Sequence, residues 1–218
     1  MIALIDYGAG NLTSVRKALA AVGAKVFTPA GPQDLARAHA MIVPGVGHFD
    51  STRALDEGWR EAIQEAVHRG APLLGICVGL QWLFEGSTEA PGVTGLGVFS
   101  GMCTRLGQAG NGIGFRFSHA PPEERNPVSL SLKVPHVGWN SLVFPRASAL
   151  MNGVPDEAQV YFTHSYAAPV VADTVAVTTY AGPFTAAVER GPISGVQFHP
   201  EKSGDVGLRV LRNWLETL

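Results

Sequence analysis

The sequence predicts an α/β protein whose central sheet begins with parallel strands and gains antiparallel strands toward the C-terminus. In the first third of the chain, short apolar runs alternate with amphipathic stretches, which is the pattern of βαβ units. From about Gly95 onward, short β-like runs follow one another between Gly, Pro and Asp turn signals. No repeat or linker interrupts the 218 residues, so we expect one domain over residues 1–218.

The first third contains three apolar runs of strand length and one amphipathic helix. Leu12, Val15 and Leu19 recur at helical spacing, with Asn11 as the expected N-cap and Gly23 as the expected stop. The runs that predict strands are residues 1–6, 25–29 and 40–45.

Longer features follow. A helix fits Ser51 to Arg69, residues 71–77 form an apolar run short enough for a buried strand, and residues 80–86 are helical in pattern. Residues 107–126 are rich in Gly, Pro, Asn and charge, which predicts an exposed loop or lid. The later strand-like runs are residues 95–106, 137–144, 158–166, 173–182, 184–191 and 193–201, and a last helix uses Val206, Val210, Leu211 and Trp214.

Composition narrows the functional class. The chain is 46% hydrophobic and 16% charged with a formal net charge of −2, and no run of Lys or Arg marks a nucleic-acid or anionic membrane surface. A small-molecule substrate or a protein partner is therefore expected. Cys77 and Cys103 are too few to indicate an oxidising compartment, and no basic leader or membrane-length apolar run occurs. We therefore expect a reduced, cytoplasmic protein.

Gly75-Ile76-Cys77-Val78-Gly79 is the sharpest local signal, because it lies between an apolar strand and a helical pattern. A nucleophile on such a strained bend needs Gly on both sides, where a Cβ would be crowded. The following helix N-terminus would favour a thiolate at Cys77. The alternative is a buried structural cysteine in a Gly-flanked turn.

A thiolate nucleophile needs a nearby base, and usually a third group that orients the base. His199 ends an apolar run, and Glu201 follows two residues later. The alternative is a surface turn with a solvated Glu201. Neither a CxxC pair nor an HExxH motif is present, so we expect no metal site. The other histidines lack such a neighbour and are expected to be packed or solvated: His39, His48, His68, His119, His136 and His164.

Acyl transfer also needs hydrogen-bond donors for a developing oxyanion. Pro44-Gly45-Val46-Gly47 is a Gly-rich turn after a strand, and its amides are candidate donors together with the amide of Val78. The alternative is an ordinary Gly-Pro turn.

Three motifs in one order, PGVGHFD at 44–50, GICVGLQ at 75–81 and GVQFHPEKS at 195–203, closely resemble the class I (triad) glutamine amidotransferases. Further segments, DYGAGNLTSV at 6–15, KVPHVGWN at 133–140 and YFTHSY at 161–166, resemble the glutaminase subunits of imidazole glycerol phosphate synthases. The resemblance covers nearly the whole chain. It implies a three-layer fold, with a mixed, mostly parallel sheet flanked by helices and added antiparallel strands.

The resemblance also implies roles for individual residues. Cys77 would attack the glutamine carboxamide, His199 would move protons to the leaving ammonia, and Glu201 would orient His199. Val46 and Gly47 would line the oxyanion hole.

Substrate contacts follow from the same resemblance. Gly45 and Gln81 would contact bound glutamine, with Gln81 one helical turn after the nucleophile. Water would hydrolyse the thioester at Cys77 to give glutamate, and no cofactor is implied.

The implied partner is a (β/α)8 cyclase subunit that forms a heterodimer with this chain. Ammonia would pass through a tunnel into that subunit, which would make imidazole glycerol phosphate and an aminoimidazole carboxamide ribotide for histidine biosynthesis. Asn11, Trp139, Asn140, Tyr161 and Lys202 would lie near the interface or tunnel mouth, although Trp139 and Tyr161 are alternatively core aromatics. Residues 107–132 look longer than the family pattern, as a surface insertion or a change in partner docking.

Three competing hypotheses remain. A different class I glutaminase, such as one serving pyridoxal phosphate synthesis, would share the triad, but the segments at 6–15 and 133–140 argue against it. A non-catalytic scaffold would not need to keep Cys77, His199 and Glu201 together. A cysteine peptidase would cleave peptides without a partner.

Overall fold

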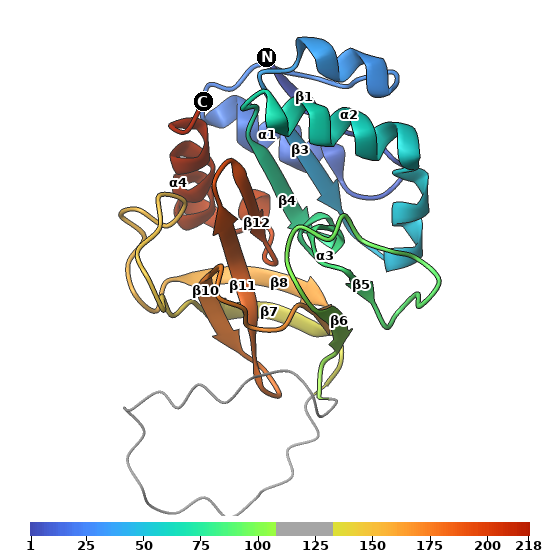
Figure 1. Ribbon diagram of the computed structural model, residues 1–218. Helices are drawn as coiled ribbons and strands as arrows, with labels where there is room; N and C mark the ends of the chain where they lie inside the picture. The colour runs from blue at the N-terminus through green and yellow to red at the C-terminus, as the bar shows by residue number, and fades with distance from the viewer. Residues whose placement is uncertain (108–132) are drawn as a thin grey trace, which may run out of the picture.

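A seven-stranded sheet forms the middle layer of the protein (Figure 1). The computed structural model describes residues 1–107 and 133–218. The strand order of the sheet is β10-β11-β12-β4-β3-β1-β2. The neighbours from β2 to β12 pair in parallel, and β11 and β10 are added in antiparallel orientation. The mixed sheet expected from the sequence is therefore confirmed. Its strands are β1 (Ile2–Leu4), β2 (Val26–Phe27), β3 (Ala40–Gly45), β4 (Leu73–Cys77), β10 (Thr174–Thr179), β11 (Pro183–Arg190) and β12 (Ile193–Val196).

Helices cover both faces of this sheet. Helix α1 (Leu12–Ala21) leads from β1 to β2, whereas α2 (Glu57–His68) leads from β3 to β4 in the opposite direction across the sheet. Since such crossovers are right-handed, α1 and α2 lie on opposite faces. Helix α4 (Gly204–Leu215) contacts α1 and shares its face (Figure 1).

Local capping explains where the first helices begin and end. The side chain of Asn11 accepts a hydrogen bond from the amide of Ser14, as an N-cap does, and Gly23 follows the helix with φ +80°. The single helix expected over Ser51–Arg69 is wrong. The segment divides into a 3-10 helix, η2 (Phe49–Ala54), and α2, because Asp56 caps a new helix by accepting from the amide of Trp59.

Several strand-like runs do not join the central sheet. A ribbon of β7 (His136–Ser141) and β8 (Gln159–His164) forms a two-stranded sheet of its own, joined to β10 by a bridge between Val143 and Val177. A small sheet contains β5 (Gly86–Ser87), β6 (Met102–Arg105) and β9 (Tyr166–Ala167). Helix α3 (Val78–Leu83) and two further 3-10 helices, η1 (Pro32–Arg37) and η3 (Pro200–Lys202), complete the described elements. The loop expected over residues 107–126 lies, apart from Gly107, outside the described residues.

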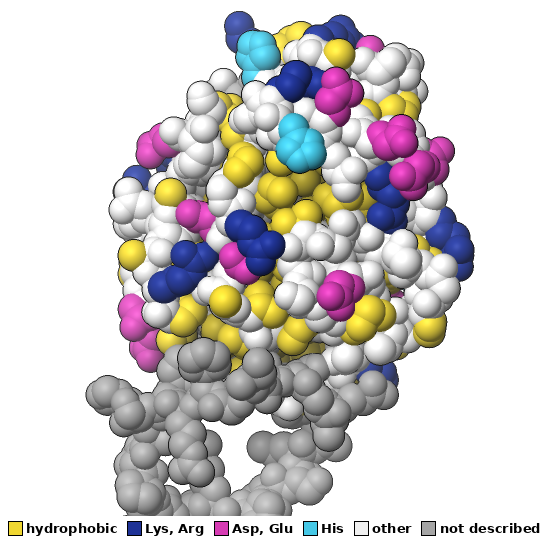
Figure 2. Space-filling view, in the orientation of Figure 1, with side chains coloured by type: hydrophobic (Ala, Val, Ile, Leu, Met, Phe, Trp, Pro, Cys, Tyr) yellow, Lys and Arg dark blue, Asp and Glu magenta, His cyan; other side chains and the backbone are white. Residues whose placement is uncertain are grey.

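Burial and charge agree with the predicted architecture. The strands β3 and β4 are buried along their whole length, which is typical of parallel strands covered on both faces. On the face shown in Figure 2, Lys and Arg side chains are interspersed with Asp and Glu, and hydrophobic side chains gather toward the centre. None of the described helices is long and apolar enough to cross a membrane.

Candidate active site

The three motifs meet at the carboxyl edge of the parallel strands. Gly45, the last residue of β3, is the register partner of Cys77, the last residue of β4. On the other side of β4, Val196 of β12 pairs with Ile76, so the segment carrying His199 leaves the sheet beside Cys77. The chain reverses its direction across the sheet between β1 and β3, and ligands of open α/β sheets bind near such a point.

Cys77 stands on a strained bend between β4 and α3. Its backbone has φ 55° and ψ −106°, a conformation that non-glycine residues rarely adopt. Close packing requires the flanking glycines, because a Cβ at Gly75 would lie 2.6 Å from the carbonyl oxygen of Gly79, and a Cβ at Gly79 would overlap the carbonyl of Val43. The bend therefore holds the thiol at the edge of the sheet.

Glu201 binds the Nδ1 atom of His199. The Nδ1 atom of His199 lies 2.8 Å from Oε1 of Glu201, and their side chains are 1% and 2% exposed. The amide of His199 donates to the carbonyl of Tyr161 in β8, which fixes the backbone at this point. The imidazole is therefore anchored at Nδ1, and Nε2 is left for chemistry.

The protonated form of His199 is favoured. Burial opposes the charge, but the interaction with Cys77 and the hydrogen bond to Glu201 outweigh it and raise the pKa of His199 to about 10. The Nε2 atom is buried and has no partner within ordinary hydrogen-bond geometry among the described residues. The segment that carries His199 leaves β12 beside the end of β4, where Cys77 stands.

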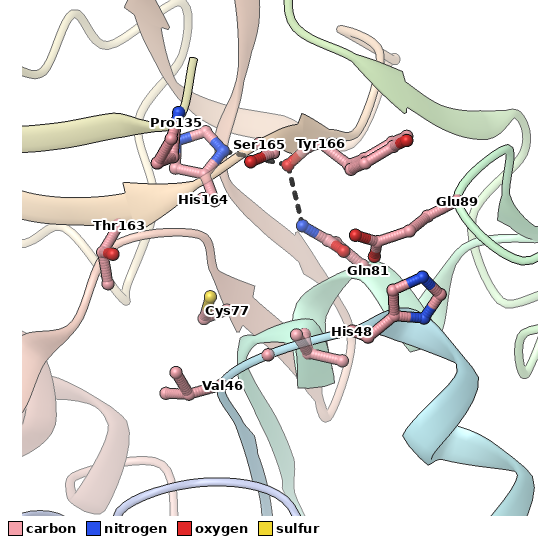
Figure 3. Close-up of a pocket in the computed structure, with 12 residues that line it drawn as sticks. Val46, His48, Cys77, Gln81, Glu89, Pro135, Thr163, His164, Ser165 and Tyr166 are labelled. Carbon is pink, nitrogen blue, oxygen red and sulfur yellow. Dashed lines mark hydrogen bonds between the residues drawn. The ribbon is translucent and has the colours of Figure 1, made fainter. Parts of the chain in front are cut away.

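A pocket of about 330 Å3 opens above the thiol. Figure 3 shows Cys77 near Val46 and Thr163 at one end of this pocket, with Gln81 and Glu89 at the other end. The expected oxyanion residues Val46, Gly47 and Val78 all line it. The remaining lining residues are His48, Pro135, His164, Ser165 and Tyr166.

Gln81 and Gly45, the expected glutamine contacts, are placed differently. Gln81 lines the pocket, and its amide nitrogen donates to the carbonyl of Tyr166 over 2.8 Å. Gly45 does not line the pocket. It faces the protein interior, where an added Cβ would overlap the hydroxyl of Tyr7 and lie 2.7 Å from Cβ of Val78. The glycine at position 45 is thus required for packing beneath the pocket.

Sequence reasoning did not single out Gln197 or Glu89, two polar residues of this site. Gln197 donates from Nε2 to the sulfur of Cys77 over 3.6 Å. Glu89 lines the pocket, and one of its carboxylate oxygens accepts from the amide of Phe49 over 2.8 Å. No spacing signal marks Glu89, whereas Gln197 lies two residues before His199, within the motif at 195–203.

The structure places the five residues expected at an interface in different surroundings. Asn11 and Lys202 line a second pocket together with Val46, and the Lys202 ammonium lies 5.5 Å from the ring centre of Tyr161. Trp139 is 56% exposed and stands edge-on to Tyr161. Asn140 differs, because its side chain is occupied by hydrogen bonds within the protein.

The second cysteine lies apart from the pocket. Cys103 is a free, buried thiol, and burial raises its pKa. Its sulfur contacts the carbonyl of Gln81. Within residues 1–107 and 133–218, no group of three or more His, Cys, Asp or Glu side chains is arranged to hold a metal ion.

Comparison with known proteins agrees with this geometry. Residues 3–218 match the family described as Glutamine amidotransferase class-I. A relative from Methanothermobacter thermautotrophicus, named imidazole glycerol phosphate synthase subunit HisH, is 43% identical over 100% of this chain and 99% of its own length. A protein of the same name from Deinococcus radiodurans is 42% identical over 100% of this chain and 94% of its own length. A crystal structure of a glutamine amidotransferase has a TM-score of 0.70 at 18% identity, covering 100% of this chain and 98% of its own, and it supports the fold.

Proposed function

Because this chain belongs to the class-I glutamine amidotransferases, and among them to the HisH subunits of imidazole glycerol phosphate synthase, we propose that it hydrolyses glutamine through Cys77, His199 and Glu201. One observation carries the proposal. A strained, pocket-facing cysteine ends strand β4, and the segment that follows the neighbouring strand β12 carries a buried histidine whose Nδ1 is bound by a carboxylate. This is the arrangement of nucleophile, base and orienting group.

Glutamine hydrolysis would proceed in two steps. The Cys77 sulfur attacks the side-chain carbonyl carbon, and the carbon–nitrogen bond then breaks as His199 gives its Nε2 proton to the departing ammonia. Water next attacks the thioester while His199 accepts a proton, and glutamate leaves with the thiol restored. The net change is glutamine and water to glutamate and ammonia. Glu201 stabilises the imidazolium in both steps.

The oxyanion formed in each step requires donors. We assign this role to the amides of Val46, Gly47 and Val78, since these residues line the pocket beside the thiol. The Val78 amide also begins helix α3, whose N-terminal end favours negative charge.

Recognition of the amino-acid end would fall to Glu89 and Gln81. The carboxylate of Glu89 lies at the end of the pocket away from Cys77 (Figure 3) and is suited to an α-ammonium group. The side-chain oxygen of Gln81 adds an acceptor, because the Gln81 nitrogen is occupied by the Tyr166 carbonyl. A substrate with its ammonium here and its carboxamide over the thiol would be glutamine.

The partner in this proposal is a cyclase subunit with a (β/α)8 barrel. It would receive the ammonia through a tunnel and produce imidazole glycerol phosphate and aminoimidazole carboxamide ribotide for histidine biosynthesis. We place its docking surface on Asn11, Trp139, Tyr161 and Lys202, because these side chains surround a pocket that includes Val46 or lie against one another nearby. The free thiol that the chemistry requires suits the reducing cytoplasm.

Glutamate release tests the proposal directly. It would be measured with this chain alone, with the purified cyclase subunit, and with that subunit plus its nucleotide substrate or product. We expect weak hydrolysis alone and a strong rise in the third mixture. Equal hydrolysis in all three would contradict the coupling to this partner, and no hydrolysis in any would contradict the glutaminase chemistry.

A further inference from the structure

Two buried histidines face each other on the ribbon beside the pocket. His136 of β7 is the register partner of His164 of β8, and their ring nitrogens Nδ1 and Nε2 lie 3.1 Å apart. Tyr180 and Phe162 stack against His136, and Phe184 packs edge-on against His164. The pair is therefore held in a fixed geometry by aromatic rings.

The hydrogen bond between His164 and Tyr166, at the end of the histidine pair nearer the pocket, determines which ring nitrogens carry a proton. Nδ1 of His164 lies 2.9 Å from the carbonyl oxygen of Tyr166. A carbonyl only accepts, so Nδ1 of His164 carries a proton, and Nε2 of the neutral ring is an acceptor. His136 must then donate from its own Nδ1 to His164.

The other end of the pair is set by Asn140. Its Oδ1 accepts from the amide of Ser141 over 2.8 Å, and its Nδ2 donates to the carbonyl of Thr179 over 3.2 Å. This fixes the orientation of the amide, so Nδ2 also donates to Nε2 of His136 over 3.3 Å. Both histidines are consequently neutral, with the proton on Nδ1, and an additional proton would have no acceptor. Burial acts in the same direction, since it lowers the pKa of His136 to about 4 and that of His164 to about 3.

The chain of hydrogen bonds continues from the Tyr166 carbonyl to the thiol of Cys77. The Tyr166 carbonyl also accepts from Nε2 of Gln81, whose other hydrogen goes to Oε1 of Gln197 over 3.1 Å. Nε2 of Gln197 then donates to the sulfur of Cys77. Each amide is oriented by the group before it. Figure 3 shows the result, with the nitrogen of Gln81 directed at the Tyr166 carbonyl and its oxygen toward the side of Glu89.

We propose that His136 and His164 are positioning residues for glutamine hydrolysis, because they hold the Tyr166 carbonyl and thereby orient the amides of Gln81 and Gln197 toward substrate and Cys77. Neither imidazole takes part in proton transfer. The inference rests on the proposed function, since it assumes that the pocket binds glutamine and that Cys77 is the nucleophile.

Substitutions at His136 separate a role in directing hydrogen bonds from a role in filling space. His136→Asn retains a donor at the place of Nδ1, whereas His136→Phe keeps a ring but leaves Nε2 of His164 without its donor. Thr178→Val is the matched control. It removes a buried hydrogen bond to the carbonyl of Ser141, which lies on β7 as His136 does, and it leaves the hydrogen bonds from His136 to Cys77 in place. Each variant would be assayed with the cyclase subunit and its nucleotide.

We expect His136→Phe to lower kcat/KM for glutamine by about tenfold, the effect of one misdirected buried hydrogen bond, with a higher KM. His136→Asn should stay within about threefold of the parent, and Thr178→Val should not differ from it. Unchanged kcat/KM in His136→Phe overturns the proposal, and so does an equal loss in all three variants, because that marks a purely structural role.

Nitrogen NMR of the parent protein gives a test that does not depend on activity or on the folding of any variant. Both imidazoles should be neutral and protonated on Nδ1 at pH 7. A charged ring, or a proton on Nε2 of either ring, overturns the proposal. If the parent complex makes no glutamate, the proposed function has failed, whereas the alkylation rate of Cys77 by iodoacetamide in His136→Phe and His136→Asn still tests the positioning. A rate changed only in His136→Phe supports it, and equal rates contradict it.

Discussion

A Cβ atom at Gly79 would overlap the carbonyl oxygen of Val43, so helix α3 and strand β3 approach each other more closely than any side chain allows. Val43 lies two residues before Gly45, and Gly79 lies two residues after Cys77. The contact therefore sets how the thiol and the turn at Val46 and Gly47 lie relative to each other.

Gly79→Ala should destabilise the protein by about 3 kcal/mol or more, because a backbone carbonyl in a buried strand cannot move aside as a flexible side chain can. Chemical denaturation of the purified variant measures this loss. Gly58→Ala is the control, since a Cβ there meets only ordinary contacts on helix α2, and it should be neutral or stabilising by up to about 1 kcal/mol. Similar stability of both variants would show that the bend between β4 and α3 can relax.

Cys77→Ala should abolish glutamine hydrolysis, with a loss on the order of a thousandfold or more in kcat, because the thioester cannot form. The fold and partner binding should persist, since Ala occupies the same backbone conformation. Glutamate release and a thermal melt check the two statements. Cys103→Ala serves as the matched buried thiol and should retain hydrolysis. Glutamate formation at the normal rate by Cys77→Ala would remove Cys77 from the mechanism.

Glu201→Gln should lower the pKa of His199 from about 10, because the carboxylate that favours the imidazolium is lost. Less imidazolium is then present at alkaline pH, so the alkaline limb of the kcat profile should move to lower pH, with kcat reduced on the order of 10- to 100-fold. The exposed Glu216→Gln is the control. An unshifted alkaline limb would show that Glu201 does not act through His199.

Stability should pass through a maximum near pH 6.5, the ordinary pKa of histidine. The pKa values of His136 and His164 are lowered in the folded protein, so the unfolded chain binds more protons between about pH 4 and 6.5, and stability falls as the pH drops through this window. The raised pKa of His199 acts oppositely, because its contribution is complete below pH 6.5 and is lost as the pH rises toward about 10.

Denaturant titrations from pH 4 to 8 measure how the free energy of unfolding changes with pH on each side of pH 6.5. This range lies above the window in which Asp173 contributes, because the pKa of that carboxyl is lowered from its ordinary value by Arg190. His136→Asn should flatten the acid slope and leave the slope above pH 6.5 unchanged. An acid slope that is the same in this variant would contradict the assignment of His136 as a buried neutral ring.

Lys202→Ala should weaken binding of the cyclase subunit by about tenfold or less, since a single rim charge contributes modestly. Calorimetric titration at two salt concentrations measures the affinity, and the difference from the parent should shrink at high salt. Lys25→Ala, which changes an exposed charge before β2 at the opposite edge of the sheet, is the control. Unchanged affinity in Lys202→Ala would exclude this residue from the interface.

Much of the architecture could be predicted because it depends on local pattern. Apolar runs of strand length located β3 and β4, and the Gly-x-Cys-x-Gly segment located the bend between β4 and α3. The helix expected over Ser51–Arg69 failed because helical spacing continues across Asp56, and only the capping hydrogen bond to Trp59 shows that a second helix begins there. The strand-like run 137–144 did not reveal that β7 pairs with β8 in a separate two-stranded sheet, or that Val143 bridges to Val177 of β10.

By itself, the sequence determined the order of strands and helices, the bend at Cys77, the adjacent His199 and Glu201, and the family to which the chain belongs. Only the tertiary structure decided which distant residues meet: Gln197 with Cys77, Glu89 with the pocket, and His136 with His164. The physical reason is that propensity and periodicity act over a few neighbouring residues. The direction of a hydrogen bond in a buried network, in contrast, depends on every donor and acceptor that packing brings within about 3 Å.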